Sequence, residues 1–120
     1  MNYNKIESSE ANINKFKLQF KNLSHVKVGN KFKGVILHDN NKFVAVLQCN
    51  IKIGYIVALE VSEQYQRQGI AMYLLELAQK DFNCNKLSVN NKNTTAIALY
   101  KKAGYTVFEE EGAMLYMEKK

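Results

Sequence analysis

Several features that would point to particular classes of protein are missing from this chain of 120 residues. It has no proline, and its two cysteines, Cys49 and Cys84, are too few for a disulfide framework. We therefore expect free thiols in a reducing compartment and a cytoplasmic location. No apolar run is long enough to cross a bilayer, and the polar start MNYNKIESSE lacks the apolar core of a signal peptide. The sequence thus predicts no membrane partner.

Histidine content and charge restrict the possible ligands. His25 and His38 are too few and too far apart to make a metal site, so no metal is expected. The formal net charge of +6 is compatible with a nucleic-acid partner, with a polyanionic small ligand, or with scattered surface charge. The lysines are spread along the chain and never exceed two in a row. We therefore expect no nucleic-acid partner, and a phosphate-bearing ligand remains open.

The first half of the chain alternates between helical and strand patterns, without repeats or linker-like segments, which predicts a single domain over residues 1–120. Apolar residues at spacings of three and four predict a helix over 8–23, capped by Ser8 or Ser9. β-branched and aromatic runs at 31–39 and 42–50, joined by Asp39-Asn40-Asn41, predict a hairpin. Residues 54–62 are apolar on both faces up to Glu60, which is typical of an interior strand.

The second half continues the alternation. A helix of about 12–14 residues is predicted to begin after Gly69, and KLSVN (86–90) is a short strand. A second helix over 93–105 has Asn93 as its N-cap and Gly104 as its left-handed end, and strands follow at 105–110 and 113–119. The order helix, three strands, helix, strand, helix, hairpin predicts a mixed α/β (α+β) fold with helices packed on a central sheet.

The loop SEQYQRQGIA leads from strand 54–62 into the helix and contains Arg67, the sole arginine of the chain. The first turn of a helix has backbone N–H groups without partners and the positive end of the helix dipole, so it can bind phosphate. Gly69 would let an anion approach without a Cβ in the way, and Arg67 can add a charge-assisted contact. The loop matches neither the Walker A nor the GxGxxG pattern. Tight packing of helix on strand is the alternative explanation of Gly69.

Two motifs resemble those of the Gcn5-related N-acetyltransferases (GNAT). VSEQYQRQGIA places Gln66, Gly69 and Ala71 at the positions of the family motif [QR]-x-x-G-x-[GA]. The second motif is matched by Asn93, Ala96, Leu99-Tyr100 and Gly104-Tyr105. The resemblance covers residues 31–119, and YQRQG and AIALY make the bacterial ribosomal-protein N-terminal acetyltransferases the most similar subgroup by eye.

The resemblance implies a fold and an activity. The fold is the GNAT fold, a mostly antiparallel central sheet with helices on both faces, here with a shortened N-terminal region. The activity is transfer of an acetyl group from acetyl-CoA to a primary amine, which attacks the thioester directly in a ternary complex.

The resemblance also implies site residues. Acetyl-CoA would lie between strands 54–62 and 86–90, Tyr100 would protonate the leaving CoA thiolate as general acid, and Asn93 would hold the cofactor chain. The implied cofactor-binding residues are the backbone of Leu59, Glu60 and Val61, the N–H groups of Arg67, Gln68, Gly69, Ile70, Ala71 and Met72, and the side chains of Gln66, Asn93 and Tyr100.

The chain also departs from the family pattern. Glu63 stands where proline is usual, and one helix is predicted where the family has a strand and two helices, so the acceptor pocket is either open or completed by a second subunit in a homodimer. Ser88 stands where the ribosomal-protein subgroup has a glutamate base. The base and the acceptor, a small amine or a protein amine, are left open. Packing is the alternative role for Tyr100, and a non-catalytic CoA-binding regulatory module is the alternative function.

Overall fold

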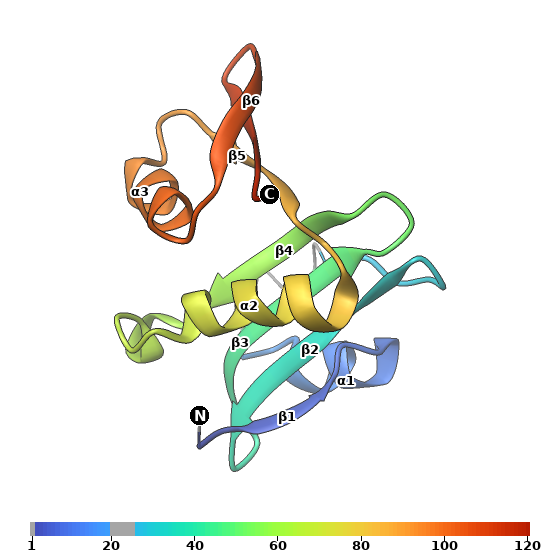
Figure 1. The fold of residues 1–120 in the computed structure, drawn as a ribbon. Coiled ribbons are helices and arrows are strands. Elements are labelled where there is room, and N and C mark those ends of the chain that lie inside the picture. The colour runs from blue at the N-terminus through green and yellow to red at the C-terminus, as the bar shows by residue number, and fades with distance from the viewer. Residues whose placement is uncertain (1, 20–25) are drawn as a thin grey trace. The chain divides into compact units, whose positions relative to one another are not determined.

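The computed structural model describes residues 2–19 and 26–120 (Figure 1). The chain divides into two compact units, an N-terminal unit up to Cys84 and a C-terminal unit from Asn85 onward. The single domain expected from the sequence therefore stays a prediction, and each unit is described by itself. None of the helices in the described residues is long and apolar enough to span a membrane.

The N-terminal unit is a sheet with helices. Its strands are β1 (Asn4–Glu7), β2 (Phe32–Asp39), β3 (Lys42–Asn50) and β4 (Tyr55–Val61), and its helical segments are α1 (Glu10–Phe16), the 3₁₀ turn η2 (Glu63–Tyr65) and α2 (Ile70–Phe82). The strands lie in the order β1-β2-β3-β4, and each neighbouring pair is antiparallel. The hairpin 31–50, the strand 54–62 and the helix after Gly69 are therefore confirmed.

The β2–β3 hairpin is formed by its turn residues and by one glycine. Asn40 and Asn41 have φ angles of 49° and 70°, which is the left-handed geometry that a two-residue hairpin turn needs and that asparagine tolerates. Gly34, opposite Gln48 in the register, lets the two backbones come close. A Cβ on Gly34 would lie against the carbonyl oxygen of Leu47, so a larger residue there would force β2 and β3 apart.

The two helices of this unit cover opposite faces of the sheet. Ile13 and Phe16 of α1 pack in one core cluster with Ile36, Phe43 and Val46. Side chains alternate across a strand, so the neighbouring buried residues Leu37, Ala45 and Leu47 point to the other face. α2 packs on β2, β3 and β4 and buries Ile70, Leu74 and Ala78. Helices on both faces, as expected from the sequence, result from this alternation.

The N-terminal segment differs from the prediction in two ways. A strand, β1, precedes the helix; it is too short to show a period of its own and exists because it pairs with β2. The helix is also shorter than predicted: α1 begins at the Ser9 cap and ends at Phe16. Beyond it, Gln19 hydrogen-bonds through its side chain to Asn41 O (2.8 Å) and the Phe43 N–H (2.7 Å). The predicted helical positions Phe20 and Leu23 lie outside the described residues.

The C-terminal unit contains β5 (Lys86–Asn90), α3 (Thr94–Lys102), β6 (Thr106–Glu111) and β7 (Met114–Glu118). β7 pairs antiparallel with both β5 and β6. Leu87, Val89, Tyr105 and Met117 are buried. The predicted caps of α3 are confirmed, because the Asn93 side chain accepts a hydrogen bond from the Ala96 N–H (3.1 Å) and Gly104 has a φ of +98°.

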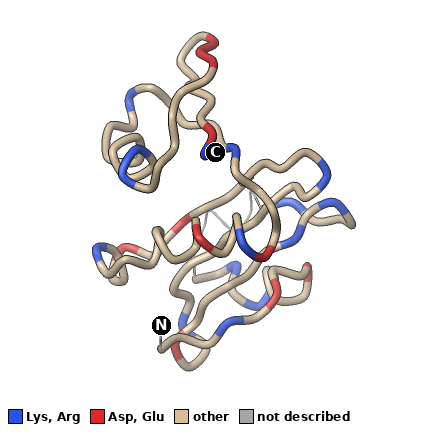
Figure 2. The backbone as a smooth tube through the Cα atoms, in the orientation of Figure 1, with Lys and Arg blue, Asp and Glu red and all other residues tan. Residues whose placement is uncertain are grey.

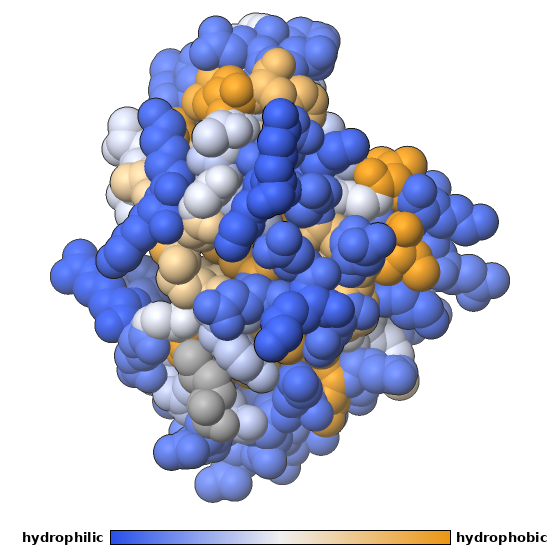
Figure 3. Space-filling model, viewed as in Figure 1, coloured by the Kyte–Doolittle hydropathy of each residue, from blue (hydrophilic) through white to orange (hydrophobic). Residues whose placement is uncertain are grey.

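The surface carries mixed charge and scattered apolar side chains. Lysines and acidic residues both occur in each of the two units (Figure 2). The face in Figure 3 is mostly hydrophilic with separate apolar patches. Residues 54–62 were expected to be buried on both faces, but Val57 is 40% exposed while Ile56 is buried. Other exposed large apolar residues are Leu18, Val28, Ile51, Ile53, Val107 and Phe108.

Candidate functional site

The start of α2 is an uncapped helix end. Gly69 is the N-cap residue with φ +79°, and it makes no side-chain cap hydrogen bond. The first bond within the helix runs from the Tyr73 N–H to Gly69 O (3.1 Å), so the N–H groups of Ile70, Ala71 and Met72 have no acceptor inside the helix. A Cβ added to Gly69 would meet nothing within 4 Å. The helix end is therefore open, with donors directed outward.

The loop before α2 has an unusual backbone. Arg67 has φ +64° and Gly69 has φ +79°. A left-handed conformation costs a non-glycine residue about 1–2 kcal/mol, so surrounding contacts must hold Arg67 in it. Successive N–H groups near left-handed residues form a concave nest that binds anions. The loop and the first turn of α2 (residues 66–72), which we call the α2 cradle, therefore have a backbone geometry that could hold a phosphate-bearing ligand.

Side-chain contacts, one local and others from the distant Tyr3, hold the α2 cradle. Gln66 Nε2 donates to Val61 O (3.1 Å), and the Tyr3 hydroxyl donates to Gln68 Oε1 (2.7 Å). The ring of Tyr3 packs edge-on against Tyr65 at 5.6 Å between centroids. The side chains of Gln66 and Gln68 are thus committed to the loop, which leaves its backbone to face a ligand.

A second set of contacts joins the loop to the β2–β3 turn. Lys42 Nζ donates to Gln64 Oε1 (2.8 Å) and lies 5.8 Å from the ring centroid of Tyr65. No sequence signal marks Tyr3, Tyr65 and Lys42, because they lie far from the helix start in the chain or carry no motif position.

The hydrogen-bond phase of β4 determines which of its residues bond to β3. The Ser62 N–H donates to Val44 O (2.8 Å), and in an antiparallel pair every second residue bonds to the partner strand. Glu60, opposite Val46, therefore turns its backbone groups toward β3, while Leu59 and Val61 turn theirs to the other edge. Of the three residues predicted to pair with a ligand, Leu59 and Val61 have the suitable orientation.

Glu60 is the carboxylate of β4. Its side chain lies on the surface, and desolvation by neighbouring atoms raises its pKa above the ordinary value. By register it shares the face of Val46 and α1, which is the face opposite α2. Within residues 2–19 and 26–120, Glu60 has no contact that would mark it as a catalytic base.

The other predicted site residues belong to the C-terminal unit. Asn93 uses its side-chain oxygen to cap α3, so its amide nitrogen is the group that could reach a ligand. Tyr100 is half-buried on α3, with its ring tilted against that of Tyr105 at 6.2 Å between centroids. Ser88, at the position where a glutamate base was expected, is exposed on β5. Both roles of Tyr100, acid and packing, are compatible with this geometry.

Residues 4–116 match the acetyltransferase (GNAT) domain family, and the chain belongs to that family. The resemblance noted in the sequence is thereby confirmed over nearly the whole chain. The match includes α2, which begins at Gly69 without a side-chain cap, and α3, which carries the residues of the second motif.

The chain is similar to curated proteins and to solved structures. Two archaeal N-alpha-acetyltransferases, from Saccharolobus solfataricus and Sulfurisphaera tokodaii, are each 39% identical over 61 residues, which is 46% of this chain and 36% of theirs. The chain therefore spans about a third of the length of these relatives.

Two solved structures show the same fold over almost the full chain. The PaiA N-acetyltransferase of Thermoplasma acidophilum, crystallised in complex with coenzyme A, has a TM-score of 0.74 at 17% identity over 100% of this chain and 99% of its own. The ribosomal-protein-S18-alanine N-acetyltransferase of Escherichia coli has a TM-score of 0.73 at 20% identity over 97% and 93%. At these identities the similarity establishes the mixed α/β GNAT fold.

Proposed function

We propose that this protein is an N-acetyltransferase that moves an acetyl group from acetyl-CoA to a primary amine. The observation that carries the proposal is the open start of α2, where an uncapped helix end, two left-handed residues and a vacant space over Gly69 form the α2 cradle. A pyrophosphate suits this place because the helix dipole and free N–H groups favour an anion. Membership of the family and the coenzyme A complex of a similar fold support the same ligand.

The residues of the chain fit acetyl-CoA in three respects. The amides of residues 67–72 would bind the pyrophosphate, with Arg67 adding an exposed positive charge. The N–H and C=O groups of Leu59 and Val61 would pair with the pantetheine as an added strand does, although Val61 O already accepts from Gln66. Asn93 would contribute its amide nitrogen.

The reaction is a direct attack of the amine on the thioester carbonyl, with CoA thiolate leaving. Tyr100 would donate its phenolic proton to that thiolate. A phenol with an ordinary pKa near 10 is a weak acid, and it suffices because a thiolate with a pKa near 8.5 leaves with little help. Ser88 stands at the position on β5 where a glutamate base was expected. The acceptor amine would therefore lose its proton to water or to a group of the acceptor molecule itself. The names of the curated relatives favour the α-amino group of a protein as acceptor.

The decisive experiment compares Gly69→Val with Gly112→Val in acetyl-CoA binding by calorimetry. Both glycines have positive φ, and a Cβ on either meets nothing within 4 Å, so both substitutions introduce similar backbone strain. We expect at least a tenfold loss of affinity for Gly69→Val alone, because the added bulk stands where the pyrophosphate would lie. Normal binding by Gly69→Val would refute the α2 cradle.

A second candidate function is a CoA-binding regulatory module without turnover, favoured by Ser88 at the base position. Release of free CoA thiol, followed over a panel of amines and peptide N-termini, separates the two. Saturable release above the rate without acceptor supports the transferase. Tight acetyl-CoA binding with no release for any acceptor supports the module.

A further inference from the structure

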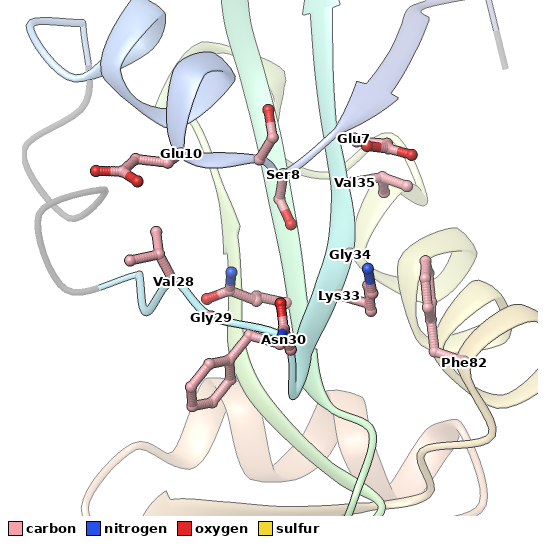
Figure 4. Close-up of a pocket in the computed structure, with 13 residues that line it drawn as sticks. Glu7, Ser8, Glu10, Val28, Gly29, Asn30, Lys33, Gly34, Val35 and Phe82 are labelled. Atoms are coloured by element: carbon pink, nitrogen blue, oxygen red, sulfur yellow. The ribbon is translucent and has the colours of Figure 1, made fainter.

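A second site lies at the sheet edge of the N-terminal unit, at the other end of α2. A pocket of about 520 Å³ opens where β1 ends at Glu7 and the chain turns away into α1 (Figure 4). Phe82, the last residue of α2, lines it, whereas the α2 cradle surrounds the first residue of that helix. A helix of 13 residues separates its two ends by ~18 Å, so this pocket is separate from the proposed acetyl-CoA site.

The pocket contains a buried hydroxyl without a partner. Ser8 is 7% exposed, and its Oγ makes no hydrogen bond in the described part of the chain. The neighbouring Ser9 uses its own Oγ to accept from the Asn12 N–H (3.3 Å). The Ser8 N–H donates to Gly34 O (3.1 Å), which fixes the residue, and its side chain points toward the space above Asn30 and Gly34 (Figure 4). A buried hydroxyl left in this state destabilises the free protein, and a ligand would relieve it.

Two carboxylates flank this hydroxyl. Glu7 and Glu10 lie on opposite sides of Ser8 (Figure 4), both are exposed, and neither is seen in an ion pair within residues 2–19 and 26–120. Gln48, 1% exposed, accepts from the Lys27 N–H through Oε1 (2.8 Å), and this bond fixes its side chain at the wall. Acceptors for a cation therefore lie beside the unpaired hydroxyl.

The rest of the wall is largely apolar. The rings of Phe32 and Phe82 contribute to it, together with Val28 and Val35. Among the described residues, Lys33 is the one cationic side chain of the lining, and with the net charge of +6 it disfavours a ligand with several positive charges.

We propose that this pocket binds an organic ammonium compound with an apolar body. The ammonium would be held by the carboxylate of Glu7 or Glu10 through a charge-assisted hydrogen bond. The apolar body would cover the phenyl rings, and the Ser8 hydroxyl would gain the partner it lacks. The proposal concerns binding at this pocket and does not depend on acetyl transfer.

The test is a titration of the isotope-labelled full chain followed by amide NMR, without acetyl-CoA. The probe is 2-phenylethylamine, and 2-phenylethanol is its uncharged analogue of the same shape. We expect saturable shifts at pocket amides such as Gly29, Gly34 and Gln48, with at least about fivefold weaker binding of the alcohol. The proposal would be overturned by any of three results. These are equal binding of both compounds, shifts confined to the α2 cradle, and the absence of a saturable shift at millimolar amine.

Matched variants identify the groups responsible. Glu7→Gln and Glu10→Gln together should weaken the amine by at least about threefold, while Glu76→Gln, an exposed carboxylate of α2 outside the pocket, should leave it unchanged. Ser8→Ala should weaken the amine without lowering the melting temperature of the free protein, because the hydroxyl has no partner to lose. Wild-type affinity in the double variant would contradict a carboxylate-bound ammonium. A lowered melting temperature with unchanged affinity in Ser8→Ala would show that the hydroxyl serves the fold.

Discussion

Arg67 and Gly69 both have positive φ, and this single backbone property connects the sequence motif with its chemistry. Glycine adopts the conformation at little cost, whereas the arginine must be held there by its surroundings. Its neighbours supply that restraint through the side chains of Gln66 and Gln68. The side chains of the loop therefore fix the backbone conformation, and the backbone is the part of the loop that is suited to bind an anion.

Tyr100 is the residue whose proposed role is easiest to isolate. Tyr100→Phe removes the hydroxyl and keeps the ring, so packing against Tyr105 is retained. We expect kcat to fall at least about tenfold with little change in the KM for acetyl-CoA, because general acid catalysis is lost and binding is not. Steady-state CoA release measures both. Tyr116→Phe, the same change at a half-buried tyrosine of β7, is the control, and unchanged kcat in Tyr100→Phe would leave the ring with a packing role.

Cys49 and Cys84 are free and buried, and we expect both to be inert in the folded protein. Burial raises the pKa of the Cys49 thiol, and burial also raises the pKa of Cys84. Only the thiolate reacts, so at pH 8 a disulfide reagent such as Ellman's should find almost no reactive thiol until denaturant is added. The raised pKa also makes the free energy of unfolding depend on pH. Above the ordinary thiol pKa of about 9, the thiols of the unfolded chain ionise before those of the folded protein. The free energy of unfolding therefore falls as the pH rises further. Rapid labelling of the native protein at pH 8 would contradict this burial.

At the scale of elements, the caps decide where the helices begin. α1 and α3 begin with a side-chain cap, from Ser9 and Asn93, whereas α2 begins without one at Gly69. A side-chain cap satisfies donors that α2 leaves unpaired. This difference among the helices is the reason that we propose the start of α2 as the ligand site.

Asn93 has two proposed uses, and substitutions can separate them. Asn93→Ala should destabilise the protein by about 1 kcal/mol through loss of the cap, and Asn93→Ser should restore most of this stability. If the amide also binds acetyl-CoA, both variants should lose affinity equally, since neither has the nitrogen. Denaturant unfolding and calorimetry give the two quantities. Full affinity in Asn93→Ser would limit the residue to capping.

At the scale of the whole molecule, the charge of +6 suits a polyanionic substrate. We expect the Kd for acetyl-CoA to rise severalfold between about 0.05 M and 0.5 M salt, because the Debye length shortens over this range. Acetyl-pantetheine, which keeps the thioester and lacks the nucleotide phosphates, should bind with little salt dependence. Equal salt dependence of the two ligands would show that the phosphates do not meet the basic charge.

The sequence by itself determined the features that depend on local chemistry. The β2–β3 hairpin followed from the Asn40-Asn41 turn, α2 from its apolar period after Gly69, and α3 from Asn93 and Gly104. Each signal lies within a few residues of the feature that it specifies, because turns, caps and amphipathic periods act over one or two helical turns. The family motifs could be recognised in the sequence for the same reason, because each is a short stretch of neighbouring residues.

The tertiary structure alone decided what depends on distant partners. β1 exists because β2 pairs with it, and Tyr3 reaches Gln68 across 65 positions of the chain. The end of α1 at Phe16 coincides with the bonds of Gln19 to the hairpin, and the Ser8 hydroxyl is left buried beside a pocket built from four separate segments. Such contacts have no sequence period, because they arise only when folding brings remote segments together.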